Sequence, residues 1–190
     1  MILHLFGGSF DPPHYGHLAV AKYFSAISDL VLISPLYASN DKTPIAPSDL
    51  RVQMCELAFG GLGNVQVTSI DIERQSTTYT IDTVSDIQMA YPEAEIHVVV
   101  GSDALKSLPT WKDISELASR VIFDVVMRKG FTPPVQSGIH FTLHELATPD
   151  VSSSAIRDLI HRSSAENSEL EALTTLEVRE FIRKNRLYHP

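Results

Sequence analysis

The chain has 190 residues, of which 44% are hydrophobic and 20% are charged, a size and composition typical of one folded globular domain rather than of a disordered or fibrous protein. Its formal net charge of −8 opposes sequence-independent binding to nucleic acid polymers or to anionic membranes, because both require a cationic surface. A single cysteine, Cys55, excludes an intrachain disulfide and a thiolate zinc cluster, and with no export signal or membrane-spanning run we expect a cytoplasmic protein whose residues 1–190 form a single domain.

Short β-branched runs alternate with amphipathic segments along the first three quarters of the chain. The runs predicted as strands are residues 2–6, 30–34, 65–70, 95–101, 121–127 and 139–143. The segments predicted as helices are residues 17–27, 48–59, 80–90 and 111–118. Because several strands are apolar at consecutive positions, we expect them to be buried on both faces. This alternation predicts the α/β class with a doubly wound parallel sheet.

The remainder of the chain has no strand pattern. Residues 154–161 and 175–184 have helical spacing, and Thr174 followed by Glu177 is typical of a capping box. We therefore expect residues 151–190 to form a helical C-terminal part of the same domain. Residues 163–167 form a polar connection, and residues 39–47 form a loop long enough to be functional.

A glycine-containing segment follows the first predicted strand and precedes the first predicted helix. Ligands of open α/β sheets bind at this end of a strand. Gly7 and Gly8 allow backbone N–H groups to approach a ligand, and the helix start adds free donors and a positive dipole end, which suits a phosphate. The segment lacks the G-x-G-x-x-G fingerprint, the P-loop lysine and the second glycine of a nucleophile elbow. Covalent serine catalysis is therefore not expected.

Two histidines, His14 and His17, are three residues apart across the helix start. This spacing can place both imidazoles on one side of the helix, facing the same phosphate, and Gly16 leaves that side open. Two alternatives stay open at this point. The histidines could be ordinary surface or core residues, or they could form a zinc pair, for which no third ligand is evident nearby.

Residues 7–17, G-G-S-F-D-P-P-H-Y-G-H, resemble the first motif of the HxGH nucleotidylyltransferases, and residues 151–157, V-S-S-S-A-I-R, resemble their second motif, I-S-S-T-x-I-R. Within that superfamily, residues 78–83, T-Y-T-I-D-T, are similar to a segment of the bacterial nicotinate mononucleotide adenylyltransferases. Further similarities lie at residues 101–103, 111–112 and 178–188. The resemblance implies a Rossmann-like nucleotidylyltransferase fold and transfer of AMP from ATP to the 5′-phosphate of nicotinate mononucleotide, giving the deamido dinucleotide and pyrophosphate in NAD biosynthesis.

The resemblance also implies roles for individual residues. The catalytic residues would be His14, His17 and Arg157. The residues expected to bind ATP are Gly7, Gly8, Ser9, Phe10, His14, His17, Lys42, Asp103, Arg128, Ser152, Ser153, Ser154 and Arg157. The residues expected to bind the acceptor are Tyr79, Thr80, Asp82, Gly101 and Trp111. Mg²⁺ would accompany ATP, held by phosphates and water without a protein side chain as ligand.

Simpler interpretations stand beside several of these assignments. The serine run could be only a helix N-cap, Tyr79, Thr80 and Asp82 only a helix start, and Asp103 only the cap of the next helix. Trp111 could be a core residue instead of a stacking surface for a pyridine ring. Arg51 is a further cationic candidate for phosphate, and Lys42 is the only residue that matches a basic stretch common after the second strand of the family. Cys55 is expected to be an inert core thiol.

Two other functions compete with the one that the resemblance implies. The first is another HxGH transferase, such as a phosphopantetheine adenylyltransferase or a cytidylyltransferase. The second is a nucleotide sensor without catalysis. The sequence leaves open the preference between nicotinate and nicotinamide acceptors and the oligomeric state.

Overall fold

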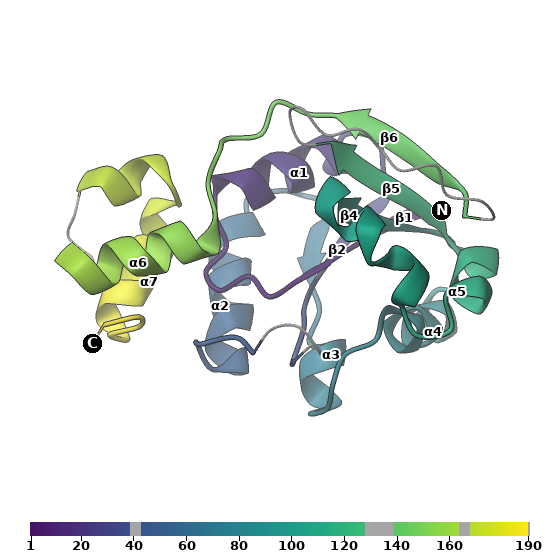
Figure 1. Cartoon of the computed structure of the whole chain (residues 1–190), viewed down its shortest axis with the longest axis horizontal. Helices are drawn as coiled ribbons and strands as arrows, with labels where there is room; N and C mark the ends of the chain where they lie inside the picture. Colours follow the sequence, from purple (N-terminus) through teal and green to yellow (C-terminus); the bar gives the residue numbers. More distant parts are fainter. Residues whose placement is uncertain (39–42, 128–138, 164–167, 190) are drawn as a thin grey trace.

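The computed structural model describes residues 1–38, 43–127, 139–163 and 168–189. Within these ranges six strands form one sheet, and every pair of neighbouring strands is parallel. In spatial order the strands are β3 (Val65–Val67), β2 (Leu30–Pro35), β1 (Ile2–Gly8), β4 (Glu95–Gly101), β5 (Ile122–Met127) and β6 (Phe141–Glu145). The predicted doubly wound parallel sheet is confirmed (Figure 1).

Five of the described α-helices lie between strands in sequence, and the last two follow the last strand. The α-helices are α1 (Tyr15–Ser25), α2 (Ser48–Phe59), α3 (Ile70–Glu73), α4 (Thr80–Ala90), α5 (Ile114–Arg120), α6 (Ser153–Ser163) and α7 (Leu176–Lys184). Three short 3₁₀ segments are η1 (Ser102–Lys106), η2 (Leu108–Thr110) and η3 (Ser168–Ala172). None of the described helices is long and apolar enough to cross a membrane.

The two faces of the sheet have separate cores. Helices α1 and α2 cover one face, where Phe24 and Phe59 pack with apolar residues such as Ile33. Helices α4 and α5 cover the other face, where Val84 and Leu117 pack with the opposite set of strand residues. Because side chains alternate along a strand, residues of one strand supply both cores, which explains why the strands are apolar at consecutive positions.

A third core attaches the C-terminal helices to α2. Ile156 of α6 and Val178 and Ile182 of α7 pack around Met54, on the side of α2 away from the sheet. In Figure 1 these yellow and light green helices lie beyond α2, at one end of the sheet. The predicted helical C-terminal part is therefore present.

Several predicted boundaries are wrong, and local backbone geometry explains them. The predicted strand 65–70 ends at Val67, because α3 begins at Ile70. The predicted helix 111–118 begins only at Ile114, after Asp113, whose φ of 50° is left-handed. The first helix begins two residues earlier than predicted and ends at Ser25. The edge strand at residues 139–143 lies instead at Phe141–Glu145.

The predicted capping box at the last helix is also wrong. The N-cap of α7 is Thr175, whose side chain accepts from the N–H of Val178. The hydroxyl of Thr174 instead donates to the carbonyl of Pro13 at 2.8 Å. The N-cap thus lies one residue later than predicted, because the hydroxyl of Thr174 attaches the C-terminal part to the glycine-containing segment.

Candidate active site

The first motif passes from the carboxyl end of β1 into the start of α1. His14 is the N-cap of α1, and its Nδ1 accepts from the N–H of His17 at 3.4 Å. The two imidazole rings are stacked, with centroids 3.7 Å apart and an angle of 21° between planes. A Cβ at Gly16 would lie 3.0 Å from the His14 ring. The two histidines therefore lie on the same side of the helix start, as predicted. A glycine at position 16 leaves room for the His14 ring.

The carboxylate of Asp11 organises the loop between β1 and α1. One oxygen accepts from the N–H of Ile45 at 2.7 Å, and the other accepts from the N–H of Ala46 at 3.0 Å and from the hydroxyl of Tyr188 at 2.8 Å. Burial, together with the Asp11 carboxylate, raises the pKa of Tyr188, so this phenol stays protonated and donates. Asp11 thereby joins the first motif to residues before α2 and to the C-terminus.

The second motif lies directly against the first. The hydroxyl of Ser152 accepts from the N–H of Ala155 at 3.2 Å, so it caps α6 as the simpler interpretation expects. The hydroxyl of Ser153 donates to the carbonyl of Pro12 at 2.8 Å, and Ser154 pairs with Ser152 at 3.0 Å between hydroxyl oxygens. The guanidinium of Arg157 reaches back to the loop of the first motif. Two segments 141 residues apart thus form one surface.

A cavity of about 640 Å³ opens at the carboxyl ends of β1 and β4. The strand order reverses between these strands, since β1 is followed by β2 on one side and by β4 on the other, and ligands of open α/β sheets bind at such a point. The predicted site residues that line the cavity are Gly7, Gly8, Tyr79, Thr80, Gly101 and Trp111. They include all predicted acceptor residues except Asp82.

The side chain of Trp111 has both a core contact and a cavity contact. It is half-buried, meets Phe123 edge to face at 6.2 Å between centroids, and lines the cavity. The neighbouring Lys112 lies 4.7 Å above the ring of Tyr79 and 3.0 Å from a carboxylate oxygen of Asp82. Asp82 is therefore placed beside the cavity wall, where it positions Lys112.

A buried polar network beneath the cavity was missed by the sequence analysis. Both oxygens of Asp71 are engaged: one accepts from Ser34 at 2.7 Å, and the other accepts from Thr83 at 2.6 Å and from Arg74 at 2.9 Å. Asp71, Ser34 and Thr83 all line the cavity. The signal available in the sequence was the position of Ser34 at the end of a buried strand, where the topology places a ligand.

Other predicted residues lie away from the cavity. Phe10 is buried, with φ of 46°, and its ring packs against Phe6, His17 and Phe59, so only its backbone can face a ligand. Asp103 is exposed in η1. Neither these two residues nor Ser9 lines the cavity.

Three basic residues outside the two motifs are predicted to bind ATP or phosphate: Lys42, Arg51 and Arg128. Arg51 is buried and donates to the carbonyls of Ala46 and Ser9. Burial lowers the pKa of its guanidinium, although the nearby Asp11 carboxylate acts in the opposite direction. Arg51 therefore holds the loop and does not face a phosphate in this arrangement, which corrects its proposed role. Lys42 and Arg128 lie outside the described residues.

The chain is similar in sequence to known proteins. The sequence profile of the cytidylyltransferase-like family matches residues 5–159. A probable nicotinate-nucleotide adenylyltransferase of Methylacidiphilum infernorum is 33% identical over 192 residues, covering 99% of this chain and 92% of the relative. The protein of the same name from Bacillus licheniformis is 32% identical over 188 residues, with coverages of 97% and 96%.

A solved structure has a similar fold. The Plasmodium falciparum nicotinic acid mononucleotide adenylyltransferase complexed with NaAD has a TM-score of 0.80 at 20% identity, covering 98% of this chain and 97% of the other. At this identity the likeness concerns the fold.

Proposed function

Because this chain belongs to the cytidylyltransferase-like family, and within it to the nicotinate-nucleotide adenylyltransferases, we propose that it transfers AMP from ATP to the 5′-phosphate of nicotinate mononucleotide. The products are nicotinate adenine dinucleotide and pyrophosphate, and the reaction belongs to NAD biosynthesis. The observation that carries the proposal is the joining of the two phosphate-binding motifs beside a cavity large enough for a pyridine nucleotide.

The chemistry requires no nucleophile from the protein. An oxygen of the acceptor phosphate attacks the α-phosphorus of ATP, the bond from that phosphorus to the bridging oxygen breaks, and pyrophosphate leaves with the bonding electrons. Catalysis then depends on alignment of the two phosphates and on neutralisation of the charge that develops. A site without an activated serine or cysteine, but rich in N–H donors, fits this reaction.

His14 and His17 would donate to the triphosphate from one side. Their stacked arrangement presents two ring edges in the same direction, at the start of a helix whose N–H groups favour anions. Arg157 and the serines of the second motif would hold the leaving pyrophosphate at the start of α6, where Arg157 supplies planar paired donors. The hydrogen bond from Ser153 to the carbonyl of Pro12 would fix the position of the second motif's donors relative to the two histidines.

The acceptor would occupy the cavity. Trp111 offers an aromatic plane to the pyridine ring, and Lys112 supplies a cation near the cavity wall. Gly7 and Gly8 lie at the carboxyl end of β1, where the first motif meets the cavity, so an acceptor phosphate placed there would face the ATP site. Thr80 at the start of α4 adds backbone donors.

Mg²⁺ would accompany ATP. The two buried carboxylates described near the site, Asp11 and Asp71, have both oxygens engaged by hydrogen bonds, so phosphates and water are the expected ligands. The bound ion would neutralise phosphate charge. We also place the reaction in the cytoplasm, because the buried free thiol of Cys55 suits a reducing compartment.

The test is a pyrophosphate-release assay with ATP and one acceptor at a time: nicotinate mononucleotide, its nicotinamide analogue, and 4′-phosphopantetheine. We expect turnover with nicotinate mononucleotide, and the ratio of kcat/KM values for the two pyridine acceptors measures the preference for carboxylate over amide. Turnover with phosphopantetheine alone would replace this proposal by another transferase activity. Binding of ATP without turnover on any acceptor would indicate a nucleotide sensor.

A further inference from the structure

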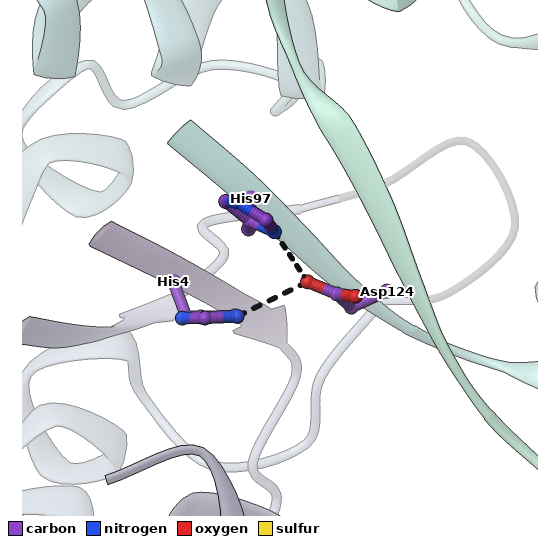
Figure 2. Close-up of side chains that lie close together, drawn as sticks. All are labelled: His4, His97 and Asp124. Carbon is purple, nitrogen blue, oxygen red and sulfur yellow. Dashed lines mark hydrogen bonds and ion pairs between the residues drawn. The ribbon is translucent and has the colours of Figure 1, made fainter. Parts of the chain in front are cut away.

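Three histidines surround the carboxylate of Asp124 on the face of the sheet that α1 covers. Nε2 of His4 lies 3.0 Å from Oδ2 of Asp124, and Nδ1 of His97 lies 2.7 Å from the same oxygen. Figure 2 shows both rings directed at this one atom. Nε2 of His144 lies 2.7 Å from the other oxygen. We call these four residues the histidine–aspartate cluster.

This cluster is separate from the candidate active site. It contacts the end of α1 and the turn after it, through Tyr23 and Ser28, whereas His14 and His17 lie at the start of the same helix. None of the four cluster residues lines the cavity. The adenylyl transfer described above therefore assigns no task to them.

The outer nitrogens of the two inner rings face hydrogen-bond acceptors. The hydroxyl of Ser28 donates to the carbonyl of Phe24, so its oxygen accepts from Nδ1 of His4 at 2.7 Å. Nε2 of His97 donates to a carboxylate oxygen of Glu95 at 2.9 Å. A neutral imidazole has one N–H, so each ring that donates outward turns a lone pair toward the shared carboxylate oxygen. Two lone pairs and an anion repel one another, so either a second proton on each ring or a metal cation between the three groups must hold them together.

We propose that Nε2 of His4, Nδ1 of His97 and the carboxylate of Asp124 bind a divalent transition-metal ion, with zinc as the best match to these donors. Their ligand atoms lie within 4.8 Å of one another. Imidazole nitrogen and carboxylate oxygen are typical zinc ligands. Metal-bound histidines usually donate their other N–H to a carboxylate or another oxygen, as His97 does to Glu95.

The remaining contacts of the cluster support the same arrangement. His144 accepts from the hydroxyl of Tyr23 at Nδ1, 3.0 Å away, and donates from Nε2 to Oδ1 of Asp124. This hydrogen bond orients the carboxylate and leaves Oδ2 directed at the two inner rings. Each of the three proposed ligands therefore has an outer partner that holds its orientation.

The space between the ligands needs a small adjustment. Ligand atoms around a tetrahedral zinc ion with bonds of about 2.0 Å lie about 3.3 Å apart, whereas Asp124 Oδ2 lies 2.7 and 3.0 Å from the two nitrogens. A retreat of the carboxylate by about half an ångström satisfies both separations. The His4 and Asp124 side chains are 3% exposed and that of His97 is 14% exposed, so an ion would arrive from the His97 side.

Metal uptake by the full chain tests the proposal. The protein is stripped with a chelator, dialysed, and titrated in the absence of ATP with Zn²⁺ against a chromophoric competitor. Co²⁺ serves as the spectroscopic probe and Mg²⁺ as the hard-cation control. The ligand variants are His4→Gln, His97→Gln and Asp124→Asn. Ser28→Ala perturbs only an outer partner, and His161→Gln, an exposed histidine of α6, is the matched control.

We expect one Zn²⁺ per chain, a higher melting temperature with Zn²⁺, and intense visible Co²⁺ bands typical of low coordination. Each ligand variant should lose stoichiometric binding, Ser28→Ala should weaken it roughly tenfold, and His161→Gln should bind as wild type. If the ligand variants do not fold, the Co²⁺ spectrum of the wild type and the affinity of Ser28→Ala decide. Weak uptake by the wild type, or an octahedral Co²⁺ spectrum, would overturn the proposal. So would uptake that survives in folded ligand variants but is lost in His17→Gln, because the ion would then lie at the first motif.

Discussion

The guanidinium of Arg157 donates from Nη1 to the backbone oxygen of Asp11 at 2.7 Å, across 146 residues of sequence. The same nitrogen lies 3.8 Å from a carboxylate oxygen of Asp11. Nη1 of the guanidinium is therefore hydrogen-bonded to the first motif. In the proposed reaction its other N–H groups would bind the leaving pyrophosphate, so Arg157 would both orient the second motif and contribute charge.

Replacement of this arginine by lysine should weaken ATP binding. An ammonium group cannot keep the contact to the Asp11 carbonyl and also present paired donors to a phosphate. We expect Arg157→Lys to raise the KM for ATP about tenfold, equivalent to about 1.4 kcal/mol, with a small effect on the acceptor KM. Arg162→Lys, at an exposed arginine of the same helix, is the control. Steady-state kinetics identical in the two variants would show that the triphosphate does not contact Arg157.

Removal of the second histidine of the first motif should act mainly on turnover. We expect His17→Ala to lower kcat by a factor on the order of 10²–10³, because a preorganised donor to developing charge is lost. His161→Ala on α6 should keep wild-type kcat. Circular dichroism establishes that both variants are folded. A folded His17→Ala protein with unchanged kcat would remove this residue from the catalytic site.

A methyl group at Gly16 should disturb His14 specifically. The added Cβ would lie 3.0 Å from both Cε1 and Nδ1 of the His14 ring, so the ring must move away from its stacked position. We expect Gly16→Ala to lower kcat by about tenfold or more, as expected for a misplaced catalytic group. At Gly61 the same change meets no atom within 4 Å, and Gly61→Ala should have wild-type kinetics. Equal kcat values for the two alanine variants would contradict the proposed steric role.

The only tryptophan of the chain should report acceptor binding. Trp111 lines the cavity, so nicotinate mononucleotide should change its fluorescence, and Trp111→Ala should raise the acceptor KM about tenfold with little change in the ATP KM. Loss of stability should be smaller than the 3–5 kcal/mol typical of a fully buried aromatic residue. Phe123→Leu, beneath Trp111 and outside the cavity lining, is the control: it should lower stability without a selective KM effect. Unchanged fluorescence and a large stability loss in Trp111→Ala would identify Trp111 as a core residue.

The single thiol should be unreactive in the folded protein. Cys55 is fully buried, and burial raises the pKa of its thiol although Arg51 acts to lower it. At neutral pH the thiolate, which is the reactive form, is therefore scarce. We expect alkylation to be more than about tenfold slower than in guanidinium chloride, measured by mass spectrometry over time. Alkylation at the same rate in both conditions would show that α2 opens readily.

Local patterns predicted the central elements well. Residues 48–59, 80–90 and 95–101 form α2, α4 and β4 with the predicted bounds, because a glycine or proline lies at or just after the end of each segment. Predictions failed where a distant contact or a left-handed residue decides the backbone. Thr174 has the residue type of an N-cap, but its hydroxyl donates to Pro13. Trp111 has helical spacing, but the left-handed Asp113 delays the helix to Ile114.

The sequence alone was enough to predict the fold class, to locate the two motifs and to identify the family resemblance, because these depend on residue types at short spacing. The tertiary structure alone decided that Ser153 reaches Pro12 and that the carboxylates of Asp71 and Asp124 are surrounded by partners from distant strands and helices. His97 interrupts an apolar strand in the sequence, but its position directly opposite His4 depends on the register between β1 and β4. Such register depends on which strands the topology makes neighbours, and no local pattern contains that information.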